Sequence, residues 1–293
     1  MSVSAPQAPA PNGTQLLKSL RELWFHTGTA CNLNCPFCLE GSGPGDTRLQ
    51  RVKFDDIKTY IDDASRPGVE RFGFTGGEPL IVKDIVKILE YALARKPCVV
   101  LTNGTAPLIK RVHQLQLLRR QPNALTFKVS IDYPDEQRHD AGRGMGNFRK
   151  AIEGLKLLHD HGFGVGLTRQ AEANESAPDV ELQWRAVLKK FRLPEQIRIT
   201  GLPDFGVPEL RREPAASGKR AVESSPAEPM CSYSRMIVKQ AGAMRVYACP
   251  FVDDDVGFDL GSDLAVTLGA LVQTSHHRCE TCCSFGAGCH LAG

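Results

Sequence analysis

The stretch Cys31-Asn32-Leu33-Asn34-Cys35-Pro36-Phe37-Cys38 decides the fold class of this chain. It places three thiols in one short loop, directly after an apolar segment near the start of the sequence. Three thiolates at this spacing can hold three corners of a cubane iron–sulfur cluster and leave the fourth iron without a protein ligand. An open coordination position indicates catalysis, because purely structural metal sites are closed. Zinc binding by the same thiols is the alternative interpretation.

The rest of the chain has the composition of a globular protein with a substantial core. Of its 293 residues, 42% are apolar and 24% are charged, which suits one large α/β domain with a small appendage. The net charge of +3 does not indicate a nucleic-acid partner, and no apolar run approaches the roughly 20 residues that span a membrane. Without the basic-then-apolar order of an export signal, the ten cysteines indicate metal binding in a cytoplasmic protein.

Short apolar runs alternate with helical patterns between residues 20 and 202, which predicts a parallel sheet, either open or curled into a partial barrel. The expected strands are residues 23–27, 71–74, 99–101, 126–131, 164–168 and 196–199. The expected helices are residues 55–64, 84–95, 108–118, 148–159 and 180–191. Ligands gather at the carboxyl ends of such strands. Because polar loops follow the first four strands, we expect these loops to form one active-site mouth.

Composition divides the chain into four segments. We expect a flexible tail at 1–19, the sheet domain at 20–202, a linker or lid rich in Pro, Glu and Ser at 203–230, and a small cysteine-rich domain at 231–293. Six cysteines lie in the last segment, where helix or strand periodicity is weak. This indicates a small domain built around metal.

The Cys-x3-Cys-x2-Cys spacing, with an aromatic residue before the third cysteine, resembles the signature of the radical S-adenosylmethionine (SAM) superfamily. The resemblance implies a partial (β/α)6 barrel whose [4Fe-4S] cluster is held by Cys31, Cys35 and Cys38. It also implies that the amine and carboxylate of SAM chelate the open iron. A one-electron reductant such as flavodoxin or ferredoxin would then drive cleavage of SAM to a 5′-deoxyadenosyl radical.

Further loops match the SAM-binding loops of that superfamily. The run Gly76-Gly77-Glu78-Pro79 matches the loop for the SAM amino group, since glycines allow close backbone approach and Glu78 suits an ammonium; an ordinary turn is the alternative. Asn103 is expected either to meet SAM or substrate or to form a turn. Ser130 and Asp132 are expected to face SAM from one side of a strand. Arg143 matches an arginine that faces the SAM carboxylate, unless it is a solvated loop residue.

The C-terminal cysteines resemble the auxiliary-cluster domain called twitch, a shortened SPASM domain. The resemblance implies a second [4Fe-4S] cluster, because two cysteine pairs complete one cubane; a four-cysteine zinc site is the alternative. The four expected ligands are Cys231, Cys249, Cys279 and Cys282. The remaining Cys283 and Cys289 either replace Cys282, serve a further cluster or stay free. As free thiols they are candidate catalytic residues that return a hydrogen atom to a substrate radical.

The resemblance predicts an enzyme that abstracts a hydrogen atom from a small-molecule substrate, in a dehydrogenation or epimerisation of a sugar or another natural product. Maturation of a ribosomal peptide or protein is the first alternative. It is disfavoured by the lack of a separate peptide-recognition segment before residue 20. A non-catalytic iron–sulfur regulatory protein is the second alternative, and the combined SAM loops argue against it.

Overall fold

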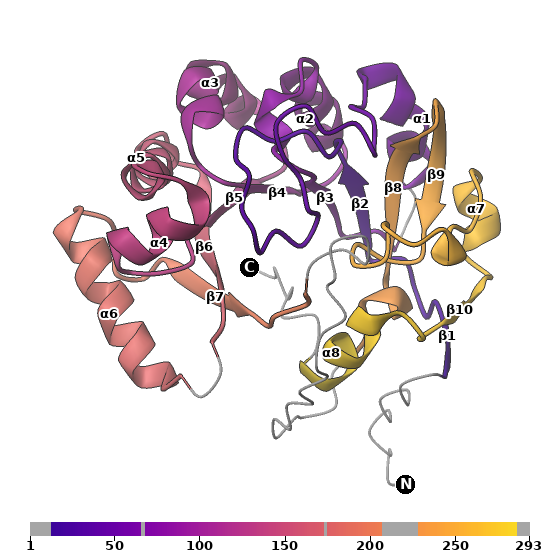
Figure 1. Ribbon diagram of the computed structural model, residues 1–293. Coiled ribbons are helices and arrows are strands. Elements are labelled where there is room, and N and C mark those ends of the chain that lie inside the picture. The colour runs from indigo at the N-terminus through magenta and orange to yellow at the C-terminus, as the bar shows by residue number, and fades with distance from the viewer. Residues whose placement is uncertain (1–12, 66–67, 173–174, 207–227, 286–293) are drawn as a thin grey trace, which may run out of the picture.

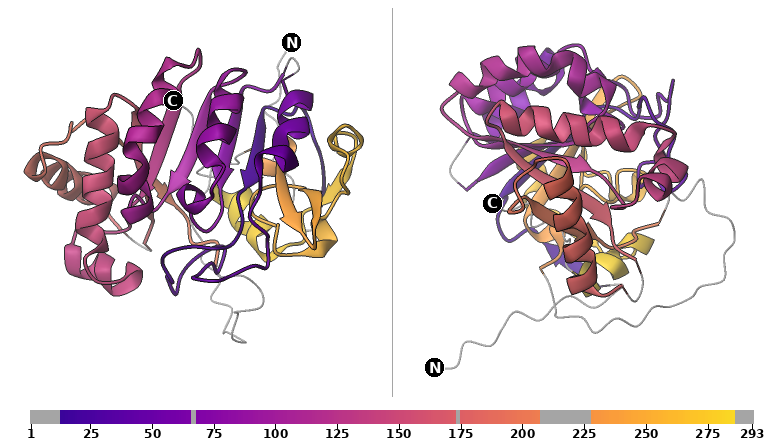
Figure 2. Two further views of the ribbon diagram at one scale, coloured as in Figure 1. Left: turned by 90° about the horizontal axis from the view of Figure 1, so that it is seen from above. Right: turned by 90° about the vertical axis from the view of Figure 1, so that its left-hand side faces the viewer.

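A curved, mostly parallel sheet with helices along its outer side forms the body of the protein (Figures 1 and 2). The computed structural model describes residues 13–65, 68–172, 175–206 and 228–285. The first parallel strands are β2 (Glu22–His26), β3 (Arg71–Thr75), β4 (Cys98–Thr102), β5 (Leu125–Ser130), β6 (Gly164–Gln170) and β7 (Arg198–Leu202). The order β7-β6-β5-β4-β3-β2-β8-β9 has two different strands at its edges. The predicted open, partial (β/α)6 barrel is therefore confirmed.

Six helices connect or follow these strands. They are α1 (Phe54–Asp63), α2 (Ile85–Leu93), α3 (Ala106–Gln116), α4 (Glu136–Arg143), α5 (Asn147–Asp160) and α6 (Ala177–Lys190). Five of them coincide with predicted helices, because each presents apolar residues at helical spacing to the sheet. In α2 this face includes Ile85, Ile88 and Leu89, none of which is exposed to solvent. The sequence interpretation missed α4, although Asp135 signals its start by capping the backbone N–H of Arg138.

The sheet continues into the segment that was predicted as a separate domain at 231–293. Strand β8 (Ser234–Gln240) pairs in parallel with β2, and β9 (Ala243–Tyr247) pairs antiparallel with β8. Ala241 and Gly242, which join them, have φ angles of 48° and 82°. Two consecutive positive φ values are typical of the type I′ turn of a tight hairpin. This hairpin lies between Cys231 and Cys249, and it is attached to the main sheet through β2.

The prediction of a flexible tail at residues 1–19 is wrong for residues 14–16, because these form a β-strand. Strand β1 (Thr14–Leu16) forms an antiparallel ribbon with β10 (Leu271–Gln273). Its facing leucines, Leu16 and Leu271, are 50% and 64% exposed, so backbone pairing rather than leucine burial holds the ribbon.

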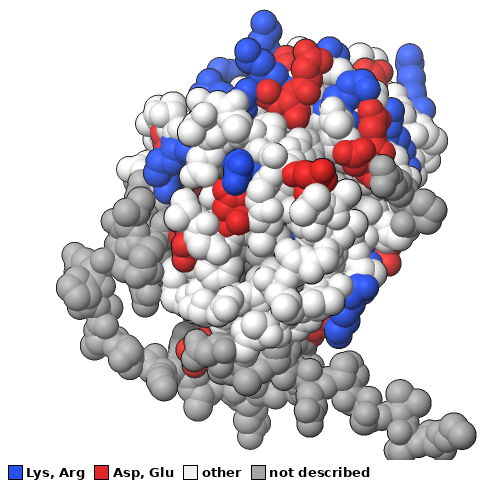
Figure 3. Space-filling view, turned by 90° about the vertical axis from the view of Figure 1, so that its right-hand side faces the viewer, with Lys and Arg blue, Asp and Glu red and all other residues white. Residues whose placement is uncertain are grey.

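The right-hand side of the molecule shows charges of both signs toward its upper end and few charges below (Figure 3).

Short elements complete the C-terminal part. These are the 3-10 turns η4 (Met230–Ser232) and η5 (Val256–Phe258) and the helices α7 (Leu264–Thr267) and α8 (His277–Phe285). Helix α8 lies on the side of the sheet opposite α1, α2 and α3 (Figure 1). No helix within the described ranges combines the length and the apolar character needed to cross a membrane.

Candidate functional site

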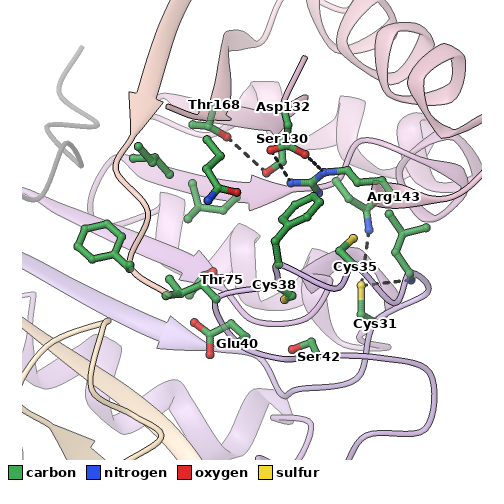
Figure 4. Close-up of a pocket in the computed structure, with 18 of the residues that line it drawn as sticks. Cys31, Cys35, Cys38, Glu40, Ser42, Thr75, Ser130, Asp132, Arg143 and Thr168 are labelled. Carbon is green, nitrogen blue, oxygen red and sulfur yellow. Dashed lines mark hydrogen bonds and ion pairs between the residues drawn. The ribbon is translucent and has the colours of Figure 1, made fainter. Parts of the chain in front are cut away.

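One pocket lies where the parallel strands end, and it contains most of the residues that the sequence singled out (Figure 4). Its volume is about 220 Å³. The predicted residues that line it are Cys31, Cys35, Cys38, Gly76, Gly77, Asn103, Ser130, Asp132 and Arg143. They come from the cysteine loop, from the carboxyl ends of β3, β4 and β5 with the loops after them, and from the last residue of helix α4. The parallel order of the strands brings these segments together, as expected for the carboxyl edge of such a sheet.

The three cysteines of the N-terminal loop are suited to metal rather than to disulfide formation. All the described cysteines are free thiols. The sulfur of Cys31 accepts hydrogen bonds from the backbone N–H of Leu33 at 3.3 Å and from the amide Nδ2 of Asn103 at 3.8 Å. Burial raises the pKa of Cys31 to about 12 and also raises that of Cys35. A cationic centre is therefore needed to hold these sulfurs as thiolates, and the donor set fits an iron–sulfur cluster.

Gly76 and Gly77 join the second loop tightly to the backbone that leads into the cysteine loop. The N–H of Gly77 donates to the carbonyl of Gly28 at 2.9 Å, and that of Glu78 donates to the carbonyl of Ala30 at 3.1 Å. Gly76 has a φ of +141°, which side chains rarely adopt. A Cβ on Gly77 would lie 2.3 Å from the carbonyl oxygen of Ala30. These glycines therefore allow the two loops to pack closely against each other. This role is separate from the close approach of a ligand that was expected from the sequence.

The structure places Glu78 away from the ammonium-binding role expected for it. Its side chain is fully buried, and neither Glu78 nor Pro79 lines the pocket. The carboxylate accepts hydrogen bonds from the N–H of Leu80 at 3.0 Å, the hydroxyl of Thr102 at 2.9 Å and the N–H of Asn103 at 2.8 Å. Burial raises its pKa despite these bonds. Glu78 therefore connects the glycine loop to the end of β4 and positions Asn103.

Arg143 already has a carboxylate partner in the protein. Its Nε lies 2.5 Å from Oδ2 of Asp132, and its Nη2 lies 3.2 Å from Oδ1. Burial lowers the pKa of Arg143, but the charge of Asp132 more than offsets this, so the pKa is raised overall. Asp132 thus occupies the bidentate fork that we had expected to face SAM. The alternative of a solvated loop arginine is wrong, because the side chain is only 15% exposed.

His139, for which the sequence suggested no role, supports this ion pair. Its Nδ1 accepts a hydrogen bond from the N–H of Asp132 at 3.3 Å. Nearby, the hydroxyls of Ser130 and Thr168 lie 3.4 Å apart across β5 and β6. Ser130 and Asp132 both line the pocket, so the expectation that they face the same side agrees with the structure.

Acid is expected to destabilise the protein through His139. Burial, followed by the charge of Arg143, lowers its pKa from 6.5 to about 4. Between these two values the unfolded chain binds the proton and the folded chain does not, so the free energy of unfolding falls as the pH drops through this window, by about 3 kcal/mol. Urea denaturation from pH 7 to pH 4 should show a shallower fall for His139→Gln. An equal fall in both proteins would contradict the assignment.

The C-terminal cysteines meet in a second, smaller pocket of about 20 Å³. Those lining it are Cys231, Cys249, Cys279, Cys282 and Cys283. Burial raises the pKa of Cys231 and Cys282 to about 12 and that of Cys279 to about 11. Two pairs distant in sequence are thus brought together, which suits a compact metal group. Cys283 does not line the larger pocket, and Cys289 lies outside the described residues.

Glu40 and Phe205 are among the residues of the larger pocket that were not identified from the sequence. Glu40 lies two positions after Cys38, so its place in the cysteine loop was the available signal. Phe205 follows β7 and stacks on Phe251, with ring centroids 4.2 Å apart. An isolated aromatic residue in a polar stretch was the signal there. The described start of the predicted linker, residues 203–206, therefore packs at the pocket rather than leaving it.

Comparison with known proteins agrees with this geometry. Residues 25–169 match the family model described as the radical SAM superfamily. The chain is 34% identical over 143 residues to AlbA, the antilisterial bacteriocin subtilosin biosynthesis protein of Bacillus subtilis (strain 168), covering 48% of this chain and 31% of AlbA. It is 31% identical over 147 residues to the mycofactocin maturase MftC of Mycolicibacterium smegmatis, covering 48% and 36%. The matches thus span about a third of these curated relatives.

Two solved structures share the fold. SuiB of Streptococcus suis bound to S-adenosylmethionine superposes with a TM-score of 0.64 at 13% identity, over 87% of this chain and 67% of SuiB. The protein anSMEcpe with bound AdoMet and Kp18Cys peptide superposes with a TM-score of 0.58 at 14% identity, over 82% and 77%. At these identities the likeness concerns the fold alone.

An open α/β barrel with clustered cysteines at the carboxyl ends of its strands defines a class of SAM-binding iron–sulfur proteins. Residues 25–169 of the chain form a radical SAM domain, and its cofactors are accordingly a [4Fe-4S] cluster and SAM. The cysteine-rich region after β8 is consistent with the auxiliary iron–sulfur segment that the sequence resembles.

Proposed function

We propose that this protein is a radical SAM enzyme that modifies a peptide or protein. The observation that carries the proposal is the convergence of Cys31, Cys35 and Cys38 with the Gly76-Gly77 loop in a single pocket. When bound, the reduced cluster supplies the electron that cleaves SAM to methionine and a 5′-deoxyadenosyl radical, which abstracts a substrate hydrogen atom. The residues of the chain hold, orient and shield these groups.

In this proposal each side chain has a defined task. The three cysteines hold three irons, while Leu33 and Asn103 donate hydrogen bonds that stabilise the charge on the sulfur of Cys31. Arg143, held by Asp132, presents positive charge at the pocket. It attracts the SAM carboxylate but does not form a bidentate pair with it, because Asp132 already occupies the guanidinium. A flavodoxin or ferredoxin as electron donor stays a prediction.

A peptide or protein substrate has more support than the small molecule that the sequence first suggested. AlbA and MftC bear names of a bacteriocin biosynthesis protein and a maturase. SuiB, which shares the fold, has also been crystallised with the precursor peptide SuiA.

Deuterium transfer distinguishes the two substrate classes. The reduced protein is incubated with SAM and with uniformly deuterated peptides encoded by short reading frames beside its gene. We expect deuterium in 5′-deoxyadenosine and a changed peptide mass, because hydrogen abstraction moves the label from substrate to SAM-derived product. Transfer from deuterated small molecules, with none from any peptide, would overturn the peptide assignment. Complete absence of 5′-deoxyadenosine would favour a non-catalytic protein.

A second [4Fe-4S] cluster bound by Cys231, Cys249, Cys279 and Cys282 forms part of the proposal. Replacing Cys249 by alanine should lower the iron content from about eight to about four atoms per chain, because a cubane lacking one thiolate is lost. Anaerobic iron, sulfide and zinc analysis measures this. The same loss of zinc instead of iron would establish the four-cysteine zinc site.

A further inference from the structure

Three ionisable side chains meet at the wall of the pocket, and none of them has a task in the proposed function. They are His26 at the end of β2, Glu40 just after the cysteine loop, and Asp253 in the segment after β9. Nε2 of His26 lies 3.2 Å from Oε2 of Glu40 and 3.7 Å from Oδ2 of Asp253. The three candidate ligand atoms lie within 4.8 Å of one another. Because Glu40 lines the pocket (Figure 4), the cluster lies at the pocket wall.

Asp253 lacks the partners that burial demands of a carboxylate. Its side chain is 1% exposed, and neither of its oxygens accepts a hydrogen bond from any part of the chain that the structure describes. Buried charged groups are normally paired or bound to a metal. The nearby Arg278 directs its guanidinium to Asp254 and to the carbonyls of Phe251 and Leu39. The Asp253 carboxylate therefore faces His26 and Glu40, and both of its oxygens are free to bind a cation.

The His26 ring positions the two carboxylates. The N–H of Gly28 donates to its Nδ1 at 3.2 Å, so Nε2 carries the proton of the neutral ring. This one N–H faces both Glu40 and Asp253. Because the ring is neutral, it does not balance the negative charge of two carboxylates. Donors of this kind orient the carboxylates that bind metals. His26 is thus a positioning residue rather than a metal ligand.

We propose that Glu40 and Asp253 bind a hard divalent cation of the Mg²⁺ and Mn²⁺ class, with His26 orienting both carboxylates. Carboxylate oxygens are the preferred ligands of these ions, and two carboxylates balance the charge of a divalent cation. The bound ion would connect the segment after Cys38 to the segment after Cys249. It would thereby link the two cysteine-bearing regions at the wall of the pocket. This inference does not depend on the proposed function.

Manganese binding tests the inference without an activity measurement. Mn²⁺ is titrated anaerobically into the full chain with its clusters oxidised, and the free ion is followed by its EPR signal. We expect about one Mn²⁺ bound per chain. The affinity should be at least about 100-fold lower in Asp253→Asn and in Glu40→Gln, because even the partners that orient a ligand contribute about 10- to 100-fold. Bound Mn²⁺ should also raise the melting temperature of the wild type but not that of Asp253→Asn.

The matched control is Asp255→Asn, which makes the same chemical change two residues away. Asp255 caps a turn through the N–H of Gly257, and asparagine caps equally well, so this variant should bind Mn²⁺ like the wild type. Without Mn²⁺, Asp253→Asn should melt at or above the wild-type temperature, because the amide replaces a buried carboxyl group that accepts no hydrogen bond within the described chain. Equal Mn²⁺ binding by the Asp253 and Asp255 variants, or none by the wild type, would overturn the proposal. If Asp253→Asn does not fold, Glu40→Gln decides.

Discussion

Replacing Cys35 by alanine is expected to abolish SAM cleavage and to remove about four irons per chain. Cys35 is buried in the pocket, and among the residues that the structure describes it is one of the three thiols that line it. A cubane held by two protein thiolates is not retained, and without it the chain has no group that supplies the electron. Production of 5′-deoxyadenosine, measured by chromatography, should fall by at least about a thousandfold, or roughly 4 kcal/mol.

Cys98→Ala is the matched control for this experiment. Cys98 opens β4, is 3% exposed and belongs to the apolar core. Its replacement should leave the iron content and SAM cleavage unchanged and should cost only a modest amount of stability. Retention of full iron and full cleavage by Cys35→Ala would contradict the assignment of the N-terminal thiols.

The substitution Gly77→Ala is expected to disrupt the site nearly as severely without removing any ligand. Its Cβ would lie 2.3 Å from the oxygen and 2.6 Å from the carbon of the Ala30 carbonyl. Both are backbone atoms, so the segment leading into Cys31 must move. A displacement on the order of 1 Å at a reacting centre costs about a hundredfold in rate, and overpacking costs about 1–3 kcal/mol of stability. SAM cleavage and urea denaturation measure the two effects.

Gly269→Ala controls for the loss of a glycine. No atom lies within 4 Å of a Cβ at Gly269, and its φ is not in the left-handed range. This variant should match the wild type in both measurements. Unchanged activity and stability in Gly77→Ala would contradict this prediction, because the Gly77 loop and the Ala30 backbone would then move apart without any cost.

The cysteine loop indicated the superfamily of this protein but not the class of its substrate. The cysteine spacing was sufficient to identify the superfamily and its cofactors. The preference for a small molecule rested on spare cysteines as hydrogen donors, and Cys283 lines the C-terminal pocket instead. The proposal of a peptide or protein substrate rests instead on the names of relatives, and deuterium transfer tests it.

The elements of the sheet were largely predictable because their signals are local. Strands β2 to β6 were found within about two residues, since buried parallel strands read as continuous apolar runs. Strand β7 was displaced by two or three residues, because its exposed edge weakens that signal. Helix α4 was missed because its eight residues are mostly polar, and only His139 and Asp140 are buried.

The sequence alone determined the superfamily, the cofactors and most of the strands and helices of the barrel, because these depend on spacings within single loops and on periodicities within single elements. Only the tertiary structure decided that Glu78 is an internal connector, that Asp132 occupies the fork of Arg143, and that Asp253 meets His26. His26 and Asp253 are separated by most of the chain, and they meet because β8 pairs with β2. Such contacts follow from packing between distant segments, for which no local pattern in the sequence provides a signal.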